Sequence, residues 1–118
     1  MRPDLTSEDI TEVLSALAEP KRRQALALLW RGGEMCVCEL MRTLGATQSR
    51  MSRHMGVLKA AGLVLDRRDA QWVRYRRHPQ IPISIARIVD SALDADSSGQ
   101  RLDRRFRAGR EARMRVSA

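Results

Sequence analysis

Two cysteines, Cys36 and Cys38, are the residues whose type and spacing most suggest chemistry in this chain of 118 residues. Thiolates bind soft, thiol-seeking ions strongly, and a structural disulfide is disfavoured in a reducing compartment. The surrounding pattern predicts a helix, and side chains two positions apart do not share a helix face. Both sulfurs would therefore reach one small ion only if the first helical turn unwinds. A helix N-terminus would also favour thiolate over thiol.

Apolar residues at helical spacing predict four helices in the first half of the chain, with Gly and Pro residues marking their ends. The first helix carries one stripe, Ile10, Val13, Leu14 and Leu17, that we expect to be buried. In chain order these are a helix capped at Thr6 or Ser7, a helix from Pro20 to Gly32-Gly33, and helices over about 37–44 and 47–61. The tight connection at Gly45 makes the last two a helix-turn-helix.

After Gly62 the pattern changes from helical to β-prone. Residues 63–65 and 72–75 form two short runs around the polar stretch 66–71, which predicts a hairpin, or wing, with arginines at its tip and along one edge. An amphipathic helix over about 83–93 follows two prolines. The predicted fold is mainly α with a small β-hairpin, a winged helix-turn-helix of order α-α-α-α-β-β-α. We expect one domain over 1–98 and a flexible or marginally helical Arg-rich tail over 99–118.

Positive charge is concentrated in two segments of the chain. Residues 46–80 hold eight Lys or Arg and two Asp or Glu, residues 99–118 hold seven and two, and the whole chain carries a net charge of +8. Such concentration predicts that a polyanion binds the middle of the chain. RNA is disfavoured because aromatic residues, which would stack on its bases, make up 3% of the chain. No apolar segment is long enough to span a bilayer, so we expect a cytoplasmic protein.

The fourth predicted helix has the pattern of a DNA recognition helix. Met51, Met55 and Leu58 form one buried face, and short polar or cationic side chains lie opposite. Arginine pairs with guanine edges and glutamine with adenine edges in the major groove. His54 lies at the rim, where either a half-buried hydrogen bond or a phosphate contact suits it. The predicted DNA contacts are Gln48, Ser49, Arg50, Ser52, Arg53, His54, Arg67, Arg68 and Arg74.

Five short motifs together resemble the ArsR/SmtB family of winged-helix repressors, specifically its arsenic-responsive branch. The resemblance covers about Leu14 to Leu93, and its motifs are Cys36-Val37-Cys38-Glu39-Leu40, Ser52-Arg53-His54-Met55, Ala61-Gly62-Leu63-Val64, Trp72-Val73-Arg74-Tyr75 and Pro79-Gln80-Ile81-Pro82. It implies a homodimer that binds a palindromic DNA operator and is released by As(III) or Sb(III) at Cys36 and Cys38, with no obligatory cofactor. The implied dimer interface lies on the first and last helices, at Val13, Leu14, Leu17, Ile85, Ile88 and Val89.

The chain departs from the family pattern at Met41, where a third cysteine is frequent. A neutral thioether does not replace a thiolate for a trivalent metalloid. The third bond would therefore go to hydroxide, to a small thiol or to a ligand of the second subunit.

Three other functions compete with this interpretation. A regulator of the same fold could sense oxidants through a strained Cys36–Cys38 disulfide. A zinc sensor is disfavoured, because residues 83–93 contain Asp90 and no histidine. A small thiol-dependent metalloid reductase would need a phosphate loop or a cysteine and histidine constellation, and the sequence has neither. We therefore expect a regulator rather than an enzyme.

Overall fold

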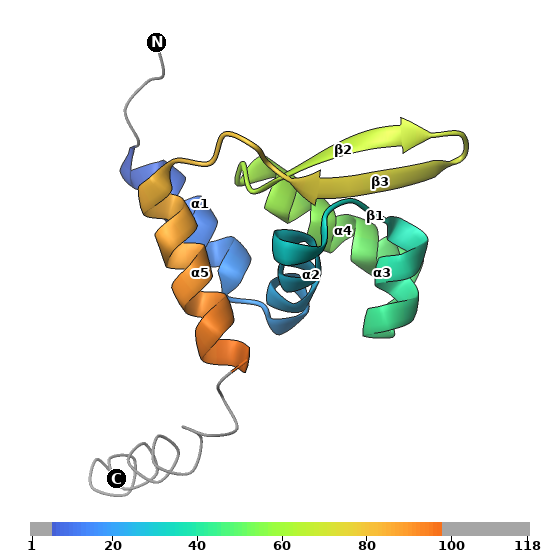
Figure 1. Ribbon diagram of the computed structural model, residues 1–118, viewed down its shortest axis with the longest axis horizontal. Coiled ribbons are helices and arrows are strands. Elements are labelled where there is room, and N and C mark those ends of the chain that lie inside the picture. Colours follow the sequence, from blue (N-terminus) through green and yellow to red (C-terminus); the bar gives the residue numbers. More distant parts are fainter. Residues whose placement is uncertain (1–5, 98–118) are drawn as a thin grey trace, which may run out of the picture.

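The computed structural model describes residues 6–97, so the predicted tail at 99–118 lies outside the described residues. Five helices and three short strands follow one another along the chain (Figure 1). In order they are α1 (Ser7–Leu17), α2 (Pro20–Gly32), β1 (Met35–Cys36), α3 (Val37–Leu44), α4 (Gln48–Ala60), β2 (Val64–Asp69), β3 (Trp72–Arg77) and α5 (Ile83–Ser97). The predicted fold, a winged helix-turn-helix, is confirmed.

Local hydrogen bonds explain where the helices begin and end. Thr6 caps α1 in a reciprocal arrangement with the Asp9 carboxylate, and the Thr47 hydroxyl accepts from the Arg50 N–H at 3.3 Å to cap α4. Between α3 and α4, Gly45 takes a left-handed conformation with φ 63°, which glycine adopts without steric cost. The tight turn of the helix-turn-helix therefore depends on this glycine.

The wing is longer than the sequence pattern predicts. β2 and β3 pair along their whole lengths, from Val64 opposite Arg77 to Asp69 opposite Trp72. The connecting turn is Ala70-Gln71, and Ala70 has φ 55°. Arg67 and Arg68 lie within β2, an edge strand of the sheet, so the prediction of arginines along one edge is confirmed and that of arginines at the tip is wrong. The charged residues 66–69 lie in an exposed part of the hairpin, where a strand needs little alternation of apolar and polar residues. The sequence pattern therefore did not indicate a strand there.

A third strand, β1, which the sequence did not predict, completes the sheet in the order β1-β3-β2. Met35 lies opposite Tyr75, and Cys36 lies opposite Arg74. The sheet thus joins the segment just before α3 to the wing.

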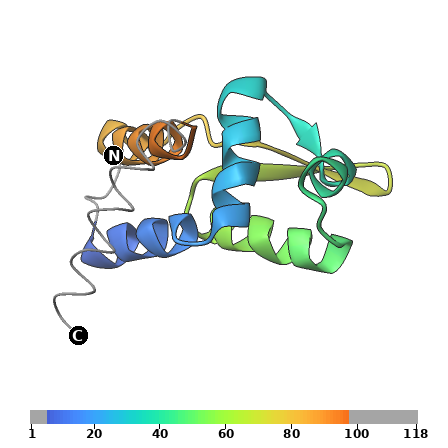
Figure 2. The same ribbon diagram turned by 90° about the horizontal axis from the view of Figure 1, so that it is seen from below.

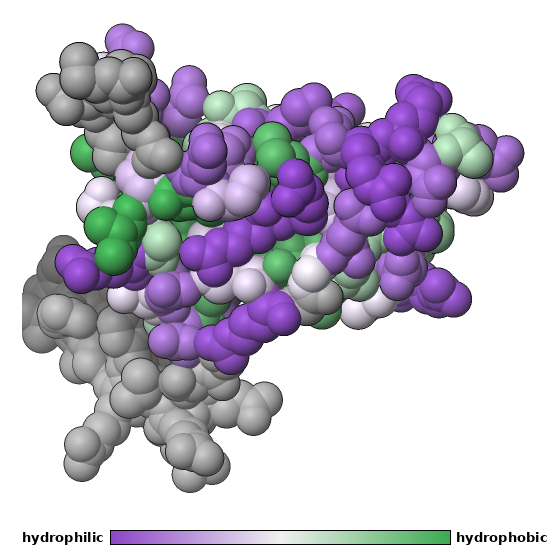
Figure 3. Space-filling model, turned by 45° about the horizontal axis from the view of Figure 1, so that its top comes forward, coloured by the Kyte–Doolittle hydropathy of each residue, from purple (hydrophilic) through white to green (hydrophobic). Residues whose placement is uncertain are grey.

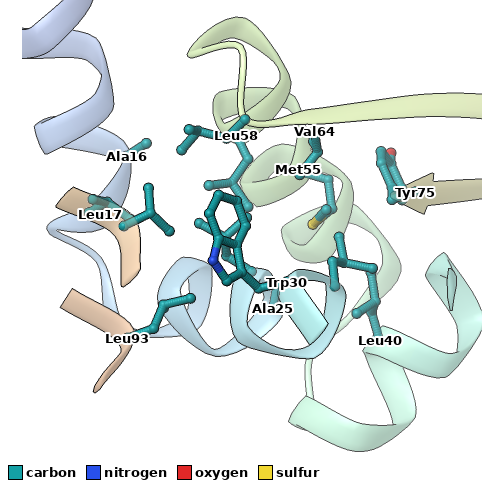
Figure 4. Packing of buried hydrophobic residues seen from close by; sticks show 14 of the residues in the cluster. Ala16, Leu17, Ala25, Trp30, Leu40, Met55, Leu58, Val64, Tyr75 and Leu93 are labelled. Carbon is teal, nitrogen blue, oxygen red and sulfur yellow. The ribbon is translucent and has the colours of Figure 1, made fainter. Parts of the chain in front are cut away.

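The core lies between the helices and the base of the wing (Figure 4). The predicted buried face of α4, formed by Met51, Met55 and Leu58, is fully buried. Trp30 of α2 donates from its indole N–H to the Asp90 carboxylate of α5. This bond satisfies the polar atom of a largely buried ring and fixes α5 against α2.

The molecule has two different ends (Figure 2). α1 and α5 lie at one end, and α3 and the wing lie at the other. Three large apolar side chains of the first end are exposed, with 39% of Ile10, 51% of Leu14 and 70% of Ile83 accessible to solvent. The expectation that Ile10 and Leu14 are buried with the rest of their stripe is therefore wrong for a single chain. Among residues 6–97, no helix has the length and apolarity to cross a membrane.

Candidate thiol site and nucleic-acid interface

Cys36 occupies the junction between a strand and a helix. It is the last residue of β1 and the N-cap of α3, with an extended backbone at φ −69° and ψ 146°. Its sulfur accepts from the Cys38 N–H at 3.3 Å, and its own N–H donates to the Glu39 carboxylate at 3.1 Å. These two bonds form a capping box in which a thiol takes the usual place of a Ser or Thr hydroxyl.

The thiols of Cys36 and Cys38 lie next to each other in the folded protein. A hydrogen bond between them is the largest cause that raises the pKa of Cys38 above its ordinary value, and desolvation adds to it. Cys36 is buried and Cys38 is half-buried. The rule that separates side chains two positions apart applies inside a helix, and Cys36 lies just outside one.

Two expectations about this site are therefore wrong. The sulfurs of Cys36 and Cys38 do not need an unwound helical turn to approach each other, because Cys36 precedes α3. The expectation that the helix N-terminus makes Cys38 a thiolate is wrong in the balance of effects, because the hydrogen bond with Cys36 raises the pKa of Cys38 more than the backbone N–H of Glu39 lowers it. As a result, the site is a preformed pair of thiols whose Cys38 member is mainly protonated at neutral pH.

The thiol pair has no third strong ligand nearby within residues 6–97. In that part of the chain, no three His, Cys, Asp or Glu residues form a group able to hold a metal ion. Met41, where the third cysteine of the family pattern would lie, is half-buried against the core. A soft ion at Cys36 and Cys38 would thus have two protein sulfurs from this chain.

The thiol site borders a set of ion pairs on the wing. Arg67 of β2 donates twice to the Glu34 carboxylate, at 2.8 and 2.6 Å, and Arg74 of β3 donates to Asp69 at 2.8 Å. The hydrogen bonds from Arg67 lower the pKa of Glu34, and that from Arg74 lowers the pKa of Asp69. Sequence reasoning missed Glu34, although it lies two residues before Cys36.

The outward face of α4 is open to solvent, as a recognition helix requires. Gln48, Ser49, Arg50, Ser52 and Arg53 are all exposed. Within residues 6–97, neither arginine makes an ion pair. Both guanidinium groups are thus available to bases or phosphates.

His54 differs from the other predicted contacts because 18% of its side chain is exposed. Its Nδ1 atom is buried without a hydrogen-bond partner and lies 3.9 Å from a Glu19 oxygen. The ring borders a cavity of about 480 Å³ beside the start of α4, which Lys21, Thr47 and Arg50 also line. Both interpretations of His54, a rim residue and a phosphate contact, fit this position.

The three predicted wing contacts differ in their availability. Arg68 is exposed and makes no ion pair within the described range 6–97, whereas Glu34 and Asp69 hold Arg67 and Arg74 in place. In Figure 3 the surface of the wing, at the right, is mostly hydrophilic. The contact of these residues with DNA stays a prediction.

The six predicted interface residues fall into two groups. Val13, Leu17, Ile85 and Val89 are buried within the single chain, Ile88 is half-buried and Leu14 is exposed. Figure 3 shows hydrophobic surface at the left, over the α1 and α5 end. Ile10 and Ile83 belong to the same end and are exposed. The pattern of apolar residues does not distinguish them from their buried neighbours. An interface at this end stays a prediction. Of the six residues predicted for it, Leu14 is exposed in the single chain, and the exposed Ile10 and Ile83 were not among the six.

Known proteins resemble this chain in both sequence and structure. The family model described as "Bacterial regulatory protein, arsR family" matches residues 19–65. Arsenic resistance transcriptional regulator ArsR2 of Pseudomonas putida is 40% identical over 86 residues, which cover 73% of this chain and 75% of that protein. The arsenical resistance operon repressor of Escherichia coli is 41% identical over 81 residues, 69% of each chain. ArsR1 of Pseudomonas putida is 40% identical over 71% of this chain, and the match spans 66% of its own length, just under two thirds.

Solved structures agree with the observed fold. NolR from Sinorhizobium fredii superposes with a TM-score of 0.62 and 33% identity, over 84% of this chain and 98% of that chain. A homodimeric winged helix-turn-helix DNA-binding domain from Mycobacterium bovis, a possible ArsR-family regulator, has a TM-score of 0.63 and 25% identity, over 83% and 92% of the two chains. The expectation of a regulator rather than an enzyme is confirmed by these relatives. Because fold, motif positions and sequence identity agree, the chain belongs to the ArsR family of bacterial regulatory proteins.

Proposed function

We propose that this protein is a transcriptional repressor that binds a palindromic DNA operator as a homodimer and leaves it when As(III) or Sb(III) binds Cys36 and Cys38. The observation that carries the proposal is the adjacent pair of thiols at the N-terminus of α3, the helix that packs against α4. Relatives named as arsenic resistance regulators support the choice of metalloid.

The site fits two of the three bonds that a trivalent metalloid forms. Cys36 and Cys38 would supply thiolates, and hydroxide, a small thiol or a residue of the second subunit would supply the third ligand. The bound metalloid contributes strong bonds to sulfur, which neither Met41 nor a carboxylate matches. Because the Cys38 thiol has a raised pKa, it must lose its proton as the bond forms.

Binding would remove the cap of α3. The Cys36 sulfur now accepts from the Cys38 N–H, and turning this sulfur toward a metalloid shared with Cys38 would break that bond. Loss of a cap costs about 0.5–2 kcal/mol, while typical coupling between two sites is about 1–3 kcal/mol. Loosening of α3 therefore supplies part of the free energy that weakens DNA binding, through the contact between α3 and α4.

DNA would be bound by the exposed face of α4 and by the wing. In a two-fold dimer, the two α4 helices would enter successive major grooves about 34 Å apart. The apolar residues exposed on α1 and α5, Ile10, Leu14 and Ile83, would be covered by the second subunit. Residues 99–118 lie outside the described residues, and their excess of arginine would add to the attraction between the protein and DNA.

A titration of labelled DNA tests the proposal. The probe is the tightest duplex selected from a randomised library, and its fluorescence anisotropy is followed with arsenite, antimonite or zinc. Arsenite or antimonite is expected to release the wild-type protein and zinc to have little effect. Cys36→Ser and Cys38→Ser should bind the same duplex and stay bound, while the matched variant Met41→Leu should respond like the wild type.

The same titration separates the oxidant-sensing alternative, which the closeness of the two thiols also supports. Release by peroxide, with a Cys36–Cys38 disulfide in the mass spectrum and no response to arsenite, would contradict the metalloid proposal. Release of both serine variants by arsenite would contradict the assigned ligands.

A further inference from the structure

We propose that Glu34 and Arg67 are positioning residues that transmit the state of the thiol pair to the wing, so that the wing as well as α4 changes when the inducer binds. The inference rests on the proposed function and deepens it, because it adds a second connection between the thiol site and the DNA-binding surface. Figure 1 shows the elements concerned, β1 beside β3 and β3 beside β2.

One row of side chains crosses all three strands at the thiol site. Cys36 of β1 lies opposite Arg74 of β3, and Arg74 lies opposite Arg67 of β2. Residues directly opposite each other in antiparallel strands point to the same face and interact. The row therefore places the Cys36 thiol on the same face as two wing arginines.

The two arginines of this row need carboxylates to remain neighbours. Like charges directly opposite each other destabilise a strand pair. Arg74 is bound by Asp69 of the wing itself, but Arg67 is bound by Glu34, which lies before β1. Its two parallel bonds give the Glu34–Arg67 pair a defined geometry that a single contact would lack. The pair thus spans β3 and ties the two outer strands together.

This arrangement determines which other part of the protein moves when Cys36 moves. β1 has two residues, so its pairing with β3 provides little resistance when Cys36 turns to bind an ion. With the Glu34–Arg67 pair intact, a displaced β1 pulls on β2, which carries the exposed Arg68. Without the Glu34–Arg67 pair, the backbone at Gly33, which has φ 79°, changes conformation instead, and the wing stays in place. The pair converts a local change into a change of the wing.

Two variants that neutralise charges of opposite sign provide the test. Glu34→Gln raises the net charge and Arg67→Gln lowers it, yet each breaks the same pair. The matched control is Asp96→Asn, which changes charge like Glu34→Gln and breaks an arginine–carboxylate pair between α2 and α5, remote from the thiols and the wing. For each full-length protein, affinity for the selected duplex is measured with and without saturating arsenite. Arsenite binding itself is followed by sulfur–arsenic absorption, and folding by thermal unfolding.

The ratio of the affinity for DNA without arsenite to the affinity with arsenite measures the coupling between the thiol site and the DNA-binding surface. Both pair-breaking variants are expected to reduce that ratio by about two- to thirtyfold, with arsenite binding retained, whereas Asp96→Asn leaves it unchanged. The indole N–H signal of Trp72, beside the wing turn, should shift on arsenite addition in the wild type and shift less in both variants. A Trp72→Phe variant assigns that signal.

Two outcomes overturn the inference, and they are distinguishable. If the wild type is released by arsenite and both variants keep the full ratio, with affinities that follow only their charge, the pair does not transmit and the proposed function stands. If the wild type is not released by arsenite at all, the proposed function fails and the inference fails with it.

Discussion

The sheet end and the α1–α5 end of this molecule differ in how their side chains are satisfied. Around the sheet, several polar groups have partners within the chain, as Arg67 has Glu34, Arg74 has Asp69 and the Cys36 thiol has the Cys38 N–H. At the other end, Leu14 and Ile83 leave apolar surface exposed. The first end is therefore suited to respond to a small ligand, and the exposed apolar surface of the second supports the proposal that a second subunit covers it.

The largest expected effect follows from placing a charge at the apolar end. Leu14→Glu should convert the dimer to a monomer, because a carboxylate buried in an apolar interface is strongly unfavourable. Affinity for a palindromic duplex should fall by about 10²-fold or more as bivalent binding is lost. Light scattering coupled to size-exclusion chromatography measures the mass, and anisotropy the affinity. Gln24→Glu, an equal charge at an exposed position of α2, should leave both unchanged; a dimeric Leu14→Glu protein would show that the interface lies elsewhere.

Within the sheet end, α4 and the wing should contribute differently to DNA binding. Arg53→Gln on α4 should cost about 1–3 kcal/mol and relax sequence preference, because arginine reads guanine directly. Arg68→Gln on the wing should weaken binding similarly on all sequences and reduce the salt dependence by about one unit. Affinities for the selected duplex and a scrambled one, each measured over a salt series, separate the two roles. Equal loss on both duplexes for Arg53→Gln would contradict the assignment of α4 as the base-reading element.

The thiol pair gives a smaller, local effect. Cys36→Ala removes the hydrogen bond that raises the pKa of Cys38 above 9.0, so this pKa should fall toward the ordinary value. More thiolate is then present at a given pH, and alkylation of Cys38 by iodoacetamide should be faster near neutral pH. Mass spectrometry of the alkylated protein over a pH series measures the midpoint. An unchanged midpoint would show that the two thiols do not interact.

The smallest expected effect is a change in the wing at acid pH. The pKa values of Glu34 and Asp69 are lowered in the folded protein by their arginine partners. Their contribution is therefore present above their ordinary values, 4.5 and 3.8, and is lost as pH falls through the lowered values. The indole signal of Trp72, at the end of the wing, should shift in this acid range while the circular dichroism signal of the helices stays constant. The change should be small because both ion pairs are exposed, and simultaneous shifts of both signals would indicate global unfolding instead.

The helices and the turn between α3 and α4 were predictable because their signals are local. Gly45, Pro20 and the cap at Thr47 act within a few residues of themselves, and the Met51, Met55 and Leu58 face follows from helical periodicity. The strand β1 was not predictable, because two residues carry no periodicity and their partners, Arg74 and Tyr75, are distant in sequence.

The site was predictable in composition but not in geometry. Cys36 and Cys38 could be singled out as a pair from the sequence, and the predicted start of the following helix, at about residue 37, agrees with α3. The error lay in applying the spacing rule for side chains within a helix to Cys36, which precedes the helix. In α1, Val13 and Leu14 were assigned to one stripe, although the helices packed against α1 bury the first and leave the second exposed. Only the packing of distant segments distinguishes them.

The double duty of Cys36, as helix cap and as thiol, bears on how such a sensor can lose its response. Serine is among the best capping residues, so the replacement keeps the hydrogen bond to the Cys38 N–H and removes the soft ligand. One substitution therefore separates folding from sensing, and natural variation at this position would yield permanently silencing forms of the protein without passing through unstable intermediates.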